Sequence, residues 1–143
     1  MKPIQDIAEV LVSSWVLTAK ADEHEELDAL PATQQGVLDR ALEAAVTAGA
    51  FPADWRERLH FVDSRTGLQC VELDAVISAA QRALFTQDPN PSYSETRTKI
   101  DPRVARLLLR RYKIKDAQAI EWGEKLREAV AAARETMRAY ARG

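Results

Sequence analysis

Eight basic side chains between positions 97 and 115 form the most promising group for binding chemistry. They are accompanied by a single acid, Asp101, so the segment carries a charge of +7: Arg97, Lys99, Arg103, Arg106, Arg110, Arg111, Lys113 and Lys115. Guanidinium and ammonium groups bind carboxylates and phosphates, and arginine adds planar, bidentate contacts. On a helix, Arg103, Arg106 and Arg110 share one face. The segment predicts a surface for an acidic partner, either nucleic acid or an acidic protein surface.

Two other interpretations of the basic segment stay open. Charge blocks are commonly just solvated. The acidic stretch 22–28 could also pair with the basic helix inside the fold. Residues 1–60 hold five basic and eleven acidic residues, a charge of −6, whereas residues 61–143 carry +4. This asymmetry is typical of an interaction surface or of self-pairing.

Side chains with catalytic potential are few. His24 lies among glutamates without a second histidine at helical spacing. Glu57 and His60 have the spacing of a di-iron helix motif, but such sites need two motifs and further glutamates. Cys70 is the only cysteine, and alternation with Val71 favours a buried strand position. The sequence predicts no catalytic residue, no metal site and no cofactor, with a small enzyme of unrecognised site as an alternative.

A winged-helix DNA-binding regulator is a second alternative. Residues 23–48 can be divided into a short helix, a turn and a recognition helix, and a hairpin at 59–72 would serve as the wing. The proposed recognition helix offers Arg40 beside Asp39 and Glu43, and the preceding segment is acidic. Acids at that place repel phosphate, so the order of elements fits this class of DNA-binding protein, but the charge of residues 23–48 does not.

The last helix carries a heptad-like apolar stripe. Its spacing alternates between three and four residues, and its small residues would allow a neighbouring helix to approach closely. We expect this stripe to support self-association or a protein partner, although packing within the domain explains it equally well. The predicted interface residues are Leu126, Val130, Ala133, Met137 and Tyr140. Gly123, in the same stripe, indicates close packing or a kink.

The elements that must position these groups are mostly helices. Apolar residues recur at three and four residues in several segments, and the period changes to two around Gly67, where two short runs predict a β-hairpin. We therefore expect one domain spanning residues 1–143, a helical bundle of about five or six helices with a central β-hairpin. A winged-helix-like core is one arrangement that this order of elements allows. The expected helices are 4–20, 33–48, a turn at 52–55, 74–85, 102–112 and 116–140.

Some side-chain positions follow from these periods. Residues 86–100 are expected to form an exposed loop before the two C-terminal helices, the first of which starts at Asp101 and Pro102. Val104, Leu107 and Leu108 are expected on its buried side. Trp55 is the tryptophan most expected at the surface. The single cysteine and the lack of a long apolar run predict a cytoplasmic chain without a membrane span, and no motif predicts a small-molecule substrate.

Overall fold

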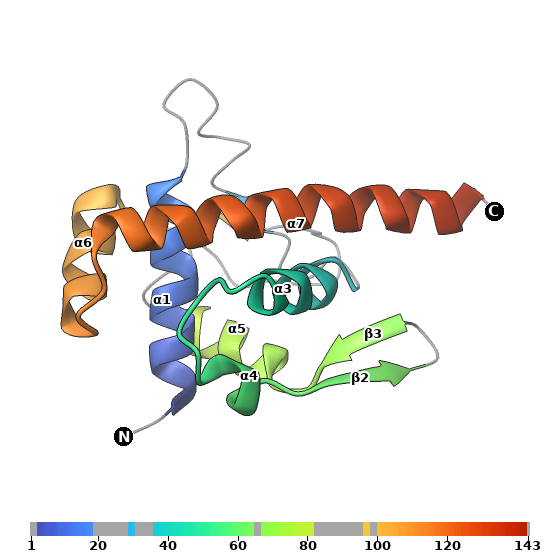
Figure 1. Ribbon diagram of the computed structural model, residues 1–143, viewed down its shortest axis with the longest axis horizontal. Coiled ribbons are helices and arrows are strands. Elements are labelled where there is room, and N and C mark those ends of the chain that lie inside the picture. Colours follow the sequence, from blue (N-terminus) through green and yellow to red (C-terminus); the bar gives the residue numbers. More distant parts are fainter. Residues whose placement is uncertain are drawn as a thin grey trace.

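Six helices and two pairs of short strands make up the described part of the chain, residues 3–18, 29–30, 36–64, 67–81, 96–97 and 100–142 of the computed structural model (Figure 1). The helices are α1 (Pro3–Leu17), α3 (Val37–Thr47), α4 (Trp55–Arg58), α5 (Leu73–Gln81), α6 (Pro102–Arg111) and α7 (Asp116–Arg142). The strands are β1 (Ala29–Leu30), β2 (Phe61–Ser64), β3 (Gly67–Cys70) and β4 (Thr96–Arg97). The predicted helical fold with a central hairpin is confirmed. Within these ranges, no helix combines the length and apolarity needed to cross a membrane.

The first helix is the centre of one half of the molecule. Ile7, Leu11 and Trp15 recur on one face of α1 and are almost fully buried. This helix packs against α5, α6 and α7, so three later segments cover it (Figure 1). Its C-terminal end is held by Arg127 of α7, whose guanidinium lies 4.0 Å from the ring centroid of Trp15 and donates to the Thr18 hydroxyl. A cation at a helix C-terminus also complements the helix dipole.

The last helix spans both halves of the molecule. Helix α7 contains 27 residues. At the rise of an α-helix its length is about 40 Å. It crosses α1 and then runs along α3 (Figure 1). A side chain built at Gly123 would clash with the Ser14 carbonyl oxygen. Glycine therefore allows α1 and α7 to approach at this crossing, which confirms the close packing predicted for it.

The hairpin packs on the other side of α3. Strands β2 and β3 pair antiparallel, with Phe61 opposite Cys70 and Ser64 opposite Gly67. Gly67 has φ +114°, a conformation that glycine adopts without strain. The backbone N–H of Cys70 donates to the Asp39 carboxylate at 2.7 Å and joins the hairpin to α3. Burial raises the pKa of Asp39, although this hydrogen bond opposes the shift.

Two expected segments differ from the structure. Helix α3 begins at Val37 after Gly36, whose φ of +79° is incompatible with a right-handed helix, so the predicted start at Thr33 is wrong. Thr96 and Arg97 form β4 inside the expected loop 86–100, pairing with β1 through backbone hydrogen bonds that side-chain patterns do not signal. Three expected segments lie outside the described residues: the rest of that loop up to residue 95, the acidic stretch 22–28 and the end of the helix expected at 74–85.

Candidate functional site

The basic face of α6 is built by a capped helix start. The carboxylate of Asp101 accepts from the Val104 backbone N–H at 2.9 Å, and Pro102 occupies the first turn, as predicted. Ala105 and Leu109 turn inward against the core. Helical geometry then directs four arginines toward solvent. All four are exposed: Arg103, Arg106, Arg110 and Arg111.

The turn between α6 and α7 extends this face. Lys113 has φ +60°, a left-handed conformation that ends α6. Its backbone N–H donates to the Arg110 carbonyl at 3.0 Å, while Ile114 turns inward and is buried. Lys113 and Lys115 therefore point away from the core on both sides of Ile114. Together with the four arginines they form what we call the basic ridge, residues Arg103, Arg106, Arg110, Arg111, Lys113 and Lys115.

An apolar side chain lies within the basic ridge. Leu107 is 55% exposed, which overturns its predicted place on the buried side of α6. The leucine run 107–109 is longer than the buried stripe of this helix, so one of its members must face outward. Leu107 is four residues from both Arg103 and Arg111 and therefore lies on the same face. The ridge offers apolar contact as well as positive charge.

The ridge is only partly neutralised by neighbouring acids. Arg106 Nε lies 3.3 Å from the Asp116 carboxylate, and Arg111 lies 3.6 Å from that of Glu9. Both arginines are exposed, and such pairs contribute about 0–1 kcal/mol. For the ridge's other four cations, no ion pair is found with any residue that the structure describes. Of the other predicted binding residues, Arg97 is in β4 with its side chain undescribed, and Lys99 lies outside the described residues.

Glu9 ties the ridge to α1. This glutamate is buried, and its two carboxylate oxygens accept from the Tyr112 hydroxyl at 2.5 Å and from Gln5 at 2.9 Å. Burial and the hydrogen bond to Glu9 raise the pKa of Tyr112 to about 12. Tyr112 therefore stays protonated and keeps donating at physiological pH. This contact fixes where α6 ends relative to α1.

A pocket of about 580 Å³ lies beside Tyr112. It is formed where the start of α1, the connection from α3 to α4 and the start of α7 meet. Apolar side chains form its floor and polar ones its rim. The floor includes Val10, Phe51, Trp55, Ile114 and Trp122, and the rim includes Asp6, Asp54, Arg58, Tyr112 and Gln118. We call it the aromatic pocket.

The floor of the aromatic pocket depends on an unusual backbone conformation. Phe51 has φ +68°, a value that bulky residues rarely adopt. This conformation stacks its ring on Trp55, with centroids 4.5 Å apart, and sets it 5.8 Å from Trp122. Trp55 is 1% exposed, so its predicted surface position is wrong. Arg56 and Arg58 follow Trp55 closely in sequence, but their guanidinium groups bond to partners elsewhere.

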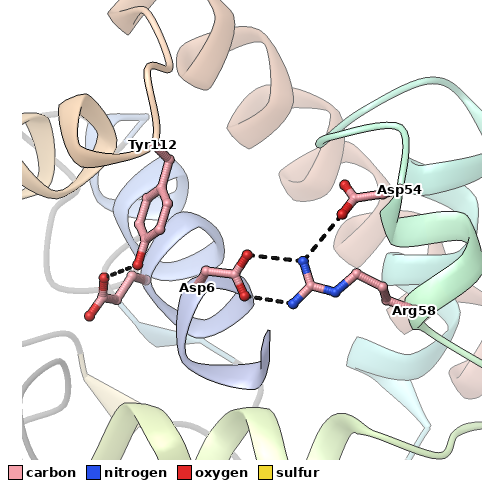
Figure 2. A network of polar contacts seen from close by, with 5 residues as sticks. Asp6, Asp54, Arg58 and Tyr112 are labelled. Carbon is pink, nitrogen blue, oxygen red and sulfur yellow. Dashed lines mark hydrogen bonds and ion pairs between the residues drawn. The ribbon is translucent and has the colours of Figure 1, made fainter. Parts of the chain in front are cut away.

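An ion-pair network borders the pocket. The Arg58 guanidinium contacts both carboxylate oxygens of Asp6, at 2.6 and 2.9 Å, and reaches Asp54 at 3.4 Å (Figure 2). The Arg58 and Asp6 side chains are about one-fifth exposed, at 22% and 21%, whereas that of Asp54 is 58% exposed. Two carboxylates and one guanidinium give this edge of the pocket a negative charge. Asp54 is the member most open to a ligand.

A second hollow of about 470 Å³ adjoins the first. It is lined by Arg110, Lys113, Ile114, Lys115 and Asp116, and we call it the basic hollow. Ile114 lines both cavities, so the two meet at this residue. The sequence did not reveal the aromatic pocket, because its walls come from segments far apart in the chain, whereas the basic hollow is lined by residues 110–116 alone. The only local signal was an aromatic residue, Phe51, between a helix-ending Gly49 and Pro52.

The predicted interface stripe on α7 is divided by the fold. Leu126, Val130 and Ala133 are buried against this chain's own core, so they are not available to a partner. A stripe with heptad spacing serves an internal neighbour as well as an external one. The side chains of Met137 and Tyr140 lie outside the described set, and an interface there stays a prediction.

His60 and Cys70, the side chains considered for catalysis, have structural roles in the hairpin region. His60 contacts Glu72 through its backbone N–H at 2.7 Å and through its ring nitrogen Nδ1 at 2.5 Å. Burial alone would raise the pKa of Glu72, but these hydrogen bonds hold it below its usual value. Burial raises the pKa of the Cys70 thiol to about 11, so it is protonated near neutral pH and is a poor nucleophile. Within the described ranges, no three metal-binding side chains gather at one place.

Comparison with known proteins supplies no relative. No family model matches the chain, and neither the curated proteins nor the solved structures contain a significant match.

Proposed function

We propose that this protein is a non-enzymatic docking protein that binds an acidic protein partner through the basic ridge. The observation that supports this most directly is the set of six exposed cations on α6 and the turn that follows it, together with the exposed Leu107 on the same helix. Arginine is enriched at protein interfaces, and apolar contacts surrounded by charge are typical of them.

The exposed leucine favours a protein over a nucleic acid. Phosphate binding needs cations, and a leucine side chain in the centre of the contact adds nothing to it. An acidic protein helix with apolar residues at helical spacing would use both kinds of side chain. The winged-helix alternative gains little, because the exposed part of α3 carries Glu43, and its Arg40 lies next to Gly67 of the hairpin.

Three probes test this proposal by fluorescence anisotropy: an amphipathic peptide with leucine and glutamate at helical spacing, polyglutamate, and a short DNA duplex. We expect the amphipathic peptide to bind most tightly. Substituting Arg103, Arg106 and Arg110 together by alanine should abolish binding, and Leu107→Ala should remove the peptide's advantage over polyglutamate. Glu124→Ala, at an exposed site on α7, is the matched control and should change nothing.

Two results would overturn the proposal. No binding of any acidic probe at low salt would remove the docking function. Tighter binding of the DNA duplex, falling steeply between about 50 and 200 mM salt and unchanged by Leu107→Ala, would make nucleic acid the partner instead.

A further inference from the structure

The two cavities that meet at Ile114 carry opposite charge. The basic hollow holds three cations and one acid, Asp116, whereas the polar edge of the aromatic pocket holds Asp6 and Asp54 with Arg58. Because Ile114 lines both, the two cavities meet at this residue, and an extended ligand that occupies both must span it. The charge along such a ligand must reverse as it crosses Ile114.

The aromatic pocket can accept an apolar side chain at the point of crossing. Its volume is about 580 Å³. Pockets of this size are typical of small-ligand sites. Val10, Phe51 and Trp122 present rings and methyl groups at its floor. The rim groups nearest to solvent are polar, with the Asp54 carboxylate more than half exposed. An anchor residue with an aromatic ring fits a floor that already contains stacked rings.

We propose that both cavities together receive one linear segment of the partner, in which an aromatic side chain stands between an acidic and a basic residue. The acidic residue lies over Lys113 and Lys115, the aromatic ring enters the aromatic pocket, and the basic residue lies over Asp54. This inference rests on the proposed docking function, since the same acidic partner is first attracted by the basic ridge. It adds that the partner must carry an aromatic residue between an acidic and a basic residue, which binding to the basic ridge alone does not require.

Tryptophan signals give a direct readout. Trp55 and Trp122 belong to the floor of the pocket, whereas Trp15 is covered by Arg127 elsewhere and serves as an internal control. The indole N–H signals of ¹⁵N-labelled protein are followed while an acetylated, amidated peptide Lys-Gly-Phe-Gly-Glu-Glu, or the same residues in reverse order, is added to about 1 mM. The expected result is movement of the Trp55 and Trp122 signals for one of the two orders, with Trp15 unchanged.

Substitutions in the protein, matched by substitutions in the peptide, identify which end of the peptide each cavity binds. Asp54→Asn should weaken the responding peptide about two- to fivefold, as expected for an exposed ion pair, but should not affect a version with lysine replaced by glycine. The double substitution Lys113→Gln and Lys115→Gln should likewise weaken the responding peptide, but should not affect a version without its glutamates. Replacing the peptide's phenylalanine by alanine should remove the tryptophan shifts.

The outcomes separate this inference from the function on which it rests. If acidic probes bind through Arg103, Arg106 and Arg110 but the Trp55 and Trp122 signals stay still, the docking function stands and the pocket inference is overturned. Equal shifts with the alanine peptide would also overturn it. If no acidic probe binds at low salt, both proposals fall together.

Discussion

Tyr112 joins two helices through a single hydroxyl group. Its hydrogen bond to Glu9 requires the protonated phenol, and burial together with this bond raises the pKa of Tyr112 to about 12. A pKa raised in the folded state means that the folded protein holds the proton more tightly. The resulting stability is complete below the ordinary tyrosine pKa of about 10. It is lost as the pH rises toward the pKa of the folded state.

We therefore predict a late-ionising tyrosine in an alkaline absorbance titration. In the wild type, one component should titrate near pH 12, and Tyr112→Phe should remove it. Tyr112→Phe should also flatten the loss of stability over the same alkaline range, measured by urea unfolding. A wild-type titration complete by about pH 10.5 would contradict this contact.

At the crossing of α1 and α7, Gly123 allows two backbones to approach. A side chain there would clash with the Ser14 carbonyl oxygen, which belongs to the backbone and cannot turn aside. We expect Gly123→Ala to destabilise the protein by about 1–3 kcal/mol, despite the better helix propensity of alanine. Urea unfolding measures this, with exposed Glu124→Ala as the control. A stabilised variant would show that the helices do not meet so closely.

The start of α6 gives a second prediction about an element. The Asp101 side chain accepts a hydrogen bond from the Val104 N–H. Asp101→Ala removes this cap and should cost roughly 0.5 to about 2 kcal/mol in urea unfolding. Asp101→Asn keeps an acceptor oxygen and should retain most of the stability. Loss of stability that is equal in both variants would instead point to the charge of Asp101 near the arginines.

Elements with strong local signals were predictable from the sequence. The Asp101–Pro102 start, the Gly67 turn and the buried stripe of α1 each depend on residues close together in the chain. Side-chain exposure was less predictable, as Leu107 and Trp55 show, because tertiary neighbours decide which member of an apolar run faces the core. The pairing of β1 with β4 depends on backbone groups brought together by the fold, and no side-chain pattern marked it.

The candidate site was likewise predictable from the sequence only in part. The basic ridge was predictable, since its six cations are close in sequence and a helix period places Arg103, Arg106 and Arg110 on one face. The aromatic pocket was not, because Asp6, Phe51 and Trp122 come from three distant segments. Sequence periodicity describes what one helix buries, but a cavity is what several elements leave unfilled.

At the scale of the whole molecule, the remaining part of α7 bears on self-association. Leu126, Val130 and Ala133 are internal, while the C-terminal end of α7 extends past α3 (Figure 1). If this end pairs with a second copy, the sedimentation mass should exceed 16.0 kDa and rise with concentration. A chain ending at Thr136 should then remain monomeric with unchanged helical circular dichroism of its core. A wild-type mass equal to that of the monomer at every concentration would exclude pairing through this helix.

The central place of α1 has a consequence for how the protein is made. Its apolar face is translated well before the residues that cover it: Tyr112 follows Glu9 by 103 residues, and Arg127 follows the Trp15 carbonyl that it contacts by 112. While the ribosome makes the intervening chain, Ile7, Leu11 and Trp15 lack the helices that cover them. Burial of α1 is therefore complete only after the first half of α7, up to Arg127, has emerged. During that interval the nascent helix is a natural target for chaperones that recognise exposed apolar segments.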